Sequence, residues 1–245
     1  MKWYSNAILK LAPGVCYSHK DITGELKKTK QNLSNSAYYW AVREMIQEGS
    51  LYRLGYDSYS LPTDSPKSEY KPHYSEQAAS LIDTLSQAFP HVAFTVFETV
   101  LLNEFLNHLI ARNTVFLQVE KESSAYVFRY LQESGTANVL FCPNKAEFDL
   151  YWSDNCVVVI DMISEAPLCP FAPHSIMLEK MLVDICADKL IAGSFSKAEL
   201  PDIYEQASAK YRIDKAKLMR YARRRNKQNE AELYLERSDG KDDNA

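Results

Sequence analysis

The chain has 245 residues, of which 46% are apolar and 24% charged, and this composition excludes a fibrous repeat and wholesale disorder. The first residues lack the features of a signal peptide. No run of about 18 uninterrupted apolar residues occurs, so we expect a cytoplasmic protein. The five cysteines are scattered and include no C-x-x-C pair, so the sequence predicts neither a disulfide framework nor a zinc site.

Charge is distributed unevenly along the chain, although its total is only −4. Residues 1–61 hold eight basic and five acidic side chains, a net charge of +3. Residues 210–227 hold nine basic side chains and one acidic, a net charge of +8, which leaves −15 for the remainder. Two basic segments beside an acidic body indicate local contact with a polyanion such as nucleic acid.

The first 62 residues predict three helices followed by a β-hairpin. The helices are expected at 3–11, ended by Pro13-Gly14, at 18–28 with Ser18 as N-cap, and at 34–48 with Ser34 as N-cap and Gly49 after the end. Residues 51–61 form two short apolar or aromatic runs around a Gly/Asp/Ser turn, which is typical of a hairpin. This order is that of a winged helix-turn-helix, which we assign to residues 1–62.

The remaining chain predicts an α/β (α+β) domain. Residues 63–74 are rich in proline and polar residues and are interpreted as a linker. Over residues 75–237 strands are expected at 94–100, 114–119, 138–142 and 156–160, and helices at 75–89, 123–134, 175–191, 197–211 and 214–235. Their alternation predicts a mixed or partly parallel sheet with helical cover and a C-terminal helical segment. Residues 238–245 are expected to be a disordered tail.

The outward face of the third helix is the candidate DNA-binding surface. Five of its side chains could touch bases or sugars, and four cations beside it could meet phosphates. The first group is Ser36, Tyr39, Trp40, Arg43 and Gln47, and the second is Lys27, Lys28, Lys30 and Arg53. Two alternatives remain open, namely that the helix and hairpin contact a protein, and that Trp40 packs against the hairpin.

A basic stripe on the last predicted helix is the second candidate surface. Helical projection places its members on one arc: Lys217, Arg220, Arg223, Arg224 and Lys227. The stripe could hold the DNA backbone, an acidic partner or the RNA-like substrate of a toxin. The alternative is a solvated face that offsets the acidic body and complements the helix dipole.

The sequence offers little for catalysis, and we expect no catalytic residue, metal or cofactor. Phosphate-cradling, zinc-protease and nucleophile-elbow motifs are all missing from it. The best case for an enzyme is a magnesium-dependent nuclease or nucleotidyltransferase that uses Glu120, Asp149 and Asp161 at strand ends. Their spacing lacks the acidic-x-Lys and Asp-x-Asp patterns of those enzymes.

Several short motifs, in this order and spacing, resemble the AbiEi-like antitoxins of bacterial abortive-infection systems and their uncharacterised relatives. They comprise Trp40-Ala41-Val42, Gly49, Leu54-Gly55 and Tyr59 near the start, Leu102-Asn103-Glu104-Phe105 with His108 and the run 115–121 in the middle, and the runs 178–184, 188–189 and 218–225 later. The resemblance implies a regulator encoded beside a nucleotidyltransferase-like toxin. Its winged helix would bind operator DNA, often an inverted repeat that accommodates two copies, and its C-terminal domain would supply most of the antitoxin activity.

The hairpin departs from the pattern of that family. The family typically has Arg-x-Gly-Arg-Gly-x-Tyr, whereas this chain has Arg53, Tyr56, Asp57 and Tyr59 in the corresponding run, so that a cation is replaced by Tyr56 and a glycine by Asp57. One phosphate contact is lost and a negative charge is added, so the resemblance implies weakened DNA binding through the wing.

Overall fold

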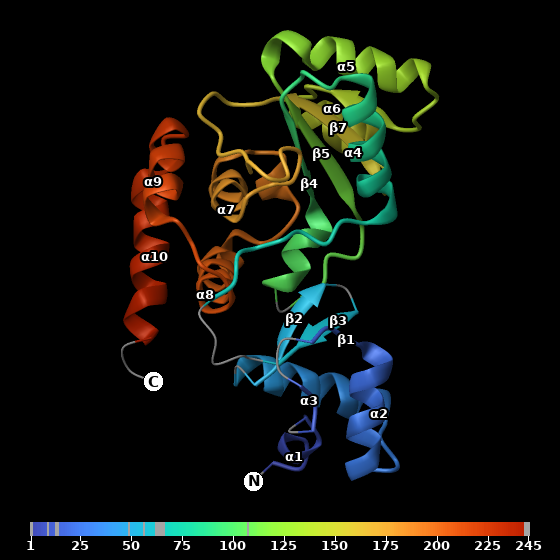
Figure 1. Cartoon of the computed structure of the whole chain (residues 1–245), viewed down its shortest axis with the longest axis vertical. Helices are drawn as coiled ribbons and strands as arrows, with labels where there is room; N and C mark the ends of the chain where they lie inside the picture. Colours follow the sequence, from blue (N-terminus) through green and yellow to red (C-terminus); the bar gives the residue numbers. More distant parts are fainter. Residues whose placement is uncertain are drawn as a thin grey trace.

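The computed structural model shows an α/β protein in which a small N-terminal unit, residues 2–61, lies at one end of a larger body, residues 67–242 (Figure 1). It describes residues 2–242 except 9, 13–14, 49, 56, 62–66 and 107. The side chains of residues 5, 6, 47, 54, 55 and 238–242 also lie outside the description. Within these limits the predicted α/β class is confirmed.

The N-terminal unit combines three helices with a small antiparallel sheet of strand order β1-β3-β2. Its elements are α1 (Ser5–Ile8), β1 (Tyr17–Ser18), α2 (His19–Thr29), α3 (Asn35–Gln47), β2 (Tyr52–Gly55) and β3 (Ser58–Ser60). The predicted N-caps are confirmed, because the hydroxyl of Ser18 accepts from the Asp21 amide and that of Ser34 from the Ala37 amide. The first helix is shorter than predicted, and its predicted stop at Pro13-Gly14, like Gly49 after α3, lies outside the described residues.

The body is built on a four-stranded mixed sheet of order β4-β5-β7-β6. The strands are β4 (Phe94–Glu98), β5 (Thr114–Val119), β6 (Val139–Phe141) and β7 (Cys156–Asp161). β4 pairs antiparallel with β5, whereas β5 and β6 both pair parallel with β7. The predicted mixed sheet is therefore confirmed, and the central strands β5 and β7 are mainly apolar and largely buried, as expected for strands covered on both faces.

Helices cover both faces of this sheet. α4 (Glu76–Ala88) and α5 (Lys121–Glu133) pack on one face, where they meet Val115, Leu117 and Val157. α7 (Leu178–Ala187) packs on the other face against Phe116 and Val158. Around α7 lie α6 (Lys145–Tyr151), α8 (Leu200–Lys210), α9 (Lys215–Arg224), α10 (Gln228–Asp242) and the 3-10 segments η1 (Thr99–Glu104), η2 (Ile191–Gly193) and η3 (Lys197–Glu199).

The second half of the predicted linker belongs to the body. Residues 63–66 lie outside the described residues, but Tyr70 and Tyr74 pack against the core, and the Tyr74 hydroxyl donates to the Val96 carbonyl at 2.7 Å. The same oxygen accepts from the Ile176 amide at 2.9 Å. The composition of this segment did not indicate that it packs on the body. Two tyrosines among prolines and polar residues are enough to dock an irregular segment.

The C-terminal helical segment is divided differently from the prediction. The single helix expected at 214–235 is two helices, because α9 ends at Arg224 and Asn226 adopts a left-handed φ of 55° before α10 begins. α10 continues to Asp242, so residues 238–242 of the predicted disordered tail are helical, while residues 243–245 lie outside the described residues.

Candidate functional site

α3 presents an exposed face beside a buried one. Tyr38, Ala41 and Met45 enter the core of the N-terminal unit, as their helical spacing predicts. On the other side Tyr39 is 59% exposed and Trp40 is 50% exposed. The rings of Tyr38 and Tyr39 pack edge to face, with their centroids 5.2 Å apart. The structure therefore leaves large aromatic side chains of α3 open to a partner.

The other predicted contacts of α3 are also accessible where they are described. Ser36 and Arg43 are exposed, and the side chain of Gln47 lies outside the described part. Trp40 does contact its own unit, since its ring meets the edge of Tyr4 at 5.8 Å, but half of its surface remains free. The predicted face of Ser36, Tyr39, Trp40 and Arg43 is therefore brought together on one exposed side of the helix.

Three lysines lie at the end of α2 and in the turn toward α3. Lys27, Lys28 and Lys30 are all exposed, as predicted. Lys28 pairs with Glu25 at 2.5 Å, and the ammonium of Lys30 lies 5.1 Å from the centre of the Trp3 ring. Exposed contacts of this kind are weak, so these cations remain available to phosphates.

Arg53 corrects the prediction, because it is not an exposed cation of the hairpin. Its side chain is only 9% exposed, and its guanidinium lies 5.7 Å from the centre of the Tyr59 ring. β2, which carries Arg53, packs against η1 of the body. Sequence alternation gives the strand face of a residue but not what that face packs against, so the burial of Arg53 could not be predicted.

Arg53 belongs to a buried polar cluster where the hairpin meets the body, which we call the junction cluster (Arg53, Glu104, Lys210 and Tyr211). The Lys210 ammonium donates to the backbone carbonyl of Arg53 at 2.8 Å and to that of Glu104 at 2.5 Å. The Tyr211 hydroxyl donates to the Glu104 carboxyl at 2.5 Å. These bonds link β2 to α8 and η1 and tie the two parts of the molecule together.

Burial shifts both ionisable pKa values of the junction cluster toward neutrality. Desolvation raises the pKa of Glu104 to about 7, opposed by the Lys210 charge and the Tyr211 hydroxyl. Desolvation likewise lowers the pKa of Lys210 to about 8, opposed by Glu104 and reinforced by Arg53. Glu104 and Lys210 are therefore ionisable groups that the junction cluster shields from solvent.

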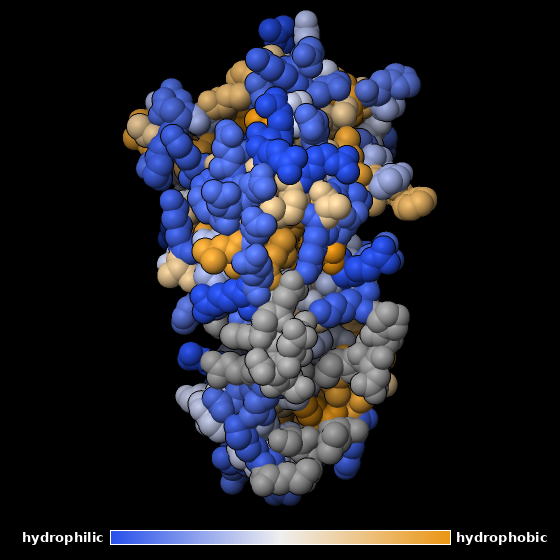
Figure 2. Space-filling view, turned by 90° about the vertical axis from the view of Figure 1, so that its left-hand side faces the viewer, coloured by the Kyte–Doolittle hydropathy of each residue, from blue (hydrophilic) through white to orange (hydrophobic). Residues whose placement is uncertain are grey.

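The predicted basic stripe lies on α9 and just beyond its end. Arg220, Arg223 and Arg224 are exposed on α9, and Lys217 on the same helix is partly exposed and pairs loosely with Asp214 at 3.7 Å. Lys227 follows the end of α9 and pairs with Glu230 at 2.6 Å, so it does not extend the stripe along one helix. Seen from the side of α9 and α10, most of the described upper surface is hydrophilic (Figure 2). Three arginines therefore form the exposed part of the patch.

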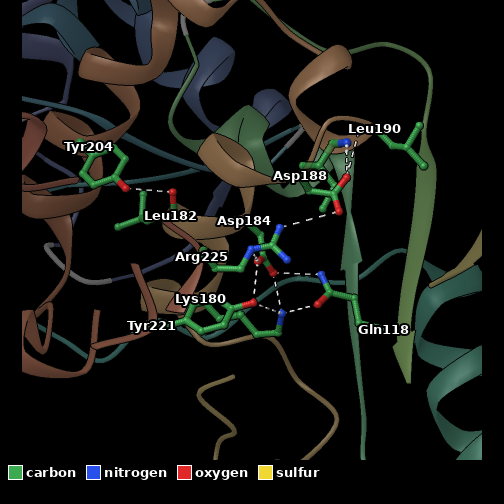
Figure 3. A network of polar contacts seen from close by, with 10 residues as sticks. Gln118, Lys180, Leu182, Asp184, Asp188, Leu190, Tyr204, Tyr221 and Arg225 are labelled. Atoms are coloured by element: carbon green, nitrogen blue, oxygen red, sulfur yellow. Dashed lines mark hydrogen bonds and ion pairs between the residues drawn. The ribbon is translucent and has the colours of Figure 1, made fainter. Parts of the chain in front are cut away.

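A buried network on α7 escaped the sequence analysis. We call Gln118, Lys180, Asp184, Tyr221 and Arg225 the α7 network (Figure 3). The Asp184 carboxylate accepts from the Lys180 ammonium at 2.5 Å, from the Gln118 amide at 3.0 Å and from the Tyr221 hydroxyl at 2.8 Å. The Lys180 ammonium also donates to Gln118 and Tyr221, and Arg225 reaches Asp184 at 3.8 Å.

The α7 network is satisfied from every side. Desolvation alone would raise the pKa of Asp184, but the Lys180 and Arg225 cations reverse this and lower it below its ordinary value. The only signal in the sequence was Lys180 and Asp184 spaced four apart within an otherwise apolar helix. Because no buried polar atom of the network lacks a partner, and only Arg225 at its edge lines a cavity, we assign it a structural role.

The three carboxylates of the enzyme alternative are not brought together. Glu120 follows the end of β5, and Asp161 ends β7 beside it, where it accepts from the Ser124 hydroxyl at 2.6 Å. Asp149 lies on α6 and lines a cavity with Thr114, the first residue of β5. Six strand residues at about 3.3 Å each separate the two ends by about 20 Å, which one metal shell cannot span. Among the described residues no cluster of His, Cys, Asp and Glu could hold a metal ion.

Two further findings concern chemistry that the sequence left aside. Cys16, Cys142, Cys156, Cys169 and Cys186 are all free thiols. In the part of the chain that is described, every helix is too short or too polar to cross a membrane.

The architecture places the chain among α/β proteins with an N-terminal helical unit and hairpin joined to a mixed sheet. Within that class it belongs to a family of unknown function (DUF6577), whose match covers residues 37–241. The matched segment begins in α3 and includes the hairpin and nearly all of the body, so it crosses the boundary predicted from the sequence at residue 62. A comparison with curated proteins gives no match.

Proposed function

We propose that this protein is a non-enzymatic, cytoplasmic DNA-binding regulator whose N-terminal unit contacts operator DNA through α3. The observation that carries the proposal is the exposed side of α3, where Tyr39, Trp40 and Arg43 are open to solvent, in a unit whose lysines at the end of α2 are also exposed. Exposed aromatic and basic side chains on a helix suit the edges of bases and the phosphates beside them.

The order of elements supports a winged helix-turn-helix. α2 and α3 are followed directly by the β2–β3 hairpin, and the third strand of the small sheet comes from the short β1 before α2. In such a unit the second helix of the pair enters the major groove and the hairpin lies near the backbone. With Arg53 buried, the hairpin offers less charge to the backbone, and α3 with its neighbouring lysines carries more of the binding.

The test is binding of the full chain to the DNA upstream of its own gene, measured by fluorescence anisotropy at several salt concentrations. Arg43→Gln is expected to weaken binding on the order of tenfold and to reduce the salt slope by about one, because one phosphate or base contact is lost. Arg129→Gln is the matched control, since Arg129 is exposed on α5, far from α3. Binding that does not respond to salt, or that Arg43→Gln leaves unchanged, contradicts the proposal.

The partner proposed for the body comes from the resemblance to AbiEi-like antitoxins. In that reading the protein counteracts a nucleotidyltransferase-like toxin encoded beside it, and two copies bind an inverted repeat. The exposed Arg220, Arg223 and Arg224 supply a surface on the body that could meet an acidic partner or compete for an RNA substrate.

A second candidate function is protein interaction without DNA contact. The burial of Arg53 and the exposure of Asp57 at the hairpin turn favour it, because both reduce the attraction of the hairpin for phosphates. Growth rescue separates the two functions when the neighbouring toxin is expressed with full-length variants. Rescue by Arg43→Gln after its DNA binding is lost would show that neutralisation is independent of DNA, whereas loss of rescue in the triple Arg220, Arg223 and Arg224 to Gln variant would assign it to α9.

A further inference from the structure

A groove of about 270 Å³ lies between the N-terminal unit and the body. α3 forms one wall with Tyr39, Val42, Arg43 and Ile46, and η1 with the loop after it forms the other. The second wall contributes Glu104, Phe105, Leu106, His108 and Leu109, and Arg53 of β2 and Gln206 of α8 complete the lining. Apolar side chains therefore dominate the groove, with a few polar groups among them, which is the usual make-up of a small-molecule pocket.

Arg53 lines this groove, and its guanidinium lies over the Tyr59 ring without a carboxylate partner among the described residues. Its Nε is buried with no hydrogen-bond acceptor, and no ion pair of Arg53 with a carboxylate occurs within the described residues. The other deeply buried cations differ, because Lys180 donates to an aspartate and Lys210 to two carbonyls. A buried charge without a partner is costly, so a group that pairs with Arg53 would be bound favourably.

The charges around the groove favour a negative ligand. Arg43 and Arg53 both line it, and the Lys210 ammonium lies nearby, hydrogen-bonded to the backbone carbonyls of Arg53 and Glu104. The one carboxyl group in the lining is Glu104, which accepts the Tyr211 hydroxyl, and burial raises its pKa to about 7. At neutral pH the cations therefore exceed the anions around the groove.

We propose that this groove is a binding site for a small organic anion. A carboxylate or phosphate head group pairs with Arg53 and is approached by Arg43, because both can offer two parallel N–H donors. The apolar part of the ligand lies against Val42, Ile46 and Leu109. The volume suits a small metabolite.

The test is calorimetric titration of the full chain, without DNA, with three probes of equal chain length: hexanoate, hexyl phosphate and hexanol. Both anions, or one of them, are expected to bind at least tenfold more tightly than hexanol, and the comparison between the two anions identifies the preferred head group. Equal affinity for the anions and hexanol, or no binding of any probe at millimolar concentrations, overturns the proposal.

Variants locate the site. Arg53→Gln is expected to lose tenfold or more in affinity for the anion, and Arg129→Gln is the control because Arg129 is exposed on α5 and does not line the groove. Leu109→Trp starts from a partly exposed side chain and fills the groove, so it tests the site even where Arg53→Gln does not fold. Wild-type affinity in Leu109→Trp, or in a folded Arg53→Gln, overturns the proposal.

Tyr39 and Arg43 belong both to this groove and to the proposed DNA-binding face. A bound anion would therefore change DNA affinity by engaging Arg43, a consequence that rests on the proposed function. Because the titration contains no DNA, anion binding can succeed where DNA binding fails, and the two results remain separate.

Discussion

The α7 network and the junction cluster are both buried and both charged, but they differ in how their charges are partnered. In the α7 network the Asp184 carboxylate receives three hydrogen bonds and two cations. In the junction cluster Arg53 has no carboxylate, and its Nε has no acceptor in the part of the chain that is described. The contrast teaches that a satisfied buried charge holds elements together, whereas an unsatisfied one marks a place that a ligand can complete.

The two clusters also sit at different kinds of boundary. The α7 network joins β5, α7 and α9 inside the body, around the larger of the cores. The junction cluster joins the hairpin, near the start of the chain, to η1 and to α8, which lies near its end. Substitutions in the first should change stability most, and substitutions in the second should change pH response and ligand binding.

Asp184→Asn is expected to have the largest effect. It leaves the Lys180 and Arg225 cations without their shared carboxylate, and removing one side of a buried ion pair costs about 3–5 kcal/mol. The free energy of unfolding from urea titration measures this loss. Asp83→Asn on the exposed side of α4 is the control, with an expected change within about 0.5 kcal/mol. A loss under 1 kcal/mol in Asp184→Asn would remove the distinction between the clusters.

Glu104→Gln is expected to change the pH dependence of stability. The folded pKa of about 7 exceeds the ordinary value of 4.5, so the stability associated with Glu104 is full below pH 4.5 and is lost as pH rises through 7. The wild type should therefore lose up to about 3 kcal/mol relative to Glu104→Gln across this window. Urea unfolding of both proteins at a series of pH values measures the difference, and parallel curves would contradict it.

Lys210 acts in a separate pH window. The folded pKa of Lys210, about 8, lies below the ordinary 10.5. The contribution of Lys210 to the stability of the protein is therefore full above pH 10.5 and is lost as pH falls through 8. Because the Glu104 charge raises the pKa of Lys210, Glu104→Gln lowers that pKa further, so the two proteins are compared well below pH 7, where Lys210 is protonated in both.

Arg53→Met is expected to have the smallest effect. The substitution removes an unpartnered cation and keeps an apolar side chain of similar length, so the free energy of unfolding should stay within about 1 kcal/mol of the wild type. Arg225→Met is the matched comparison, with an expected loss of about 2 kcal/mol, because Arg225 reaches Asp184 and Asp188 at 3.8 Å each. Equal losses from the two substitutions, by urea unfolding, would show that Arg53 is as well partnered as Arg225.

Local features of the fold could be predicted where they depend on neighbours in sequence. Ser18, Ser34 and Ser75 cap the helices that follow them, and the apolar run from Thr114 to Val119 forms a strand, because capping and periodicity act over a few residues. η1 and α6 were not predicted, since both are short and take their place from packing on the sheet. The break at Asn226 was not predicted either, because it depends on the packing of α10 beside α8.

The sequence by itself determined the α/β class, the positions of most elements and the exposed side of α3, since each follows from periodicity along a single helix or strand. Only the tertiary structure decided that Arg53 is covered, that Lys180 and Asp184 meet Gln118, and that Asp149 lies far from Glu120 and Asp161. Each of these findings concerns residues that are far apart in the sequence. The free energy of their contacts depends on burial, and a local sequence pattern does not show which residues are buried together.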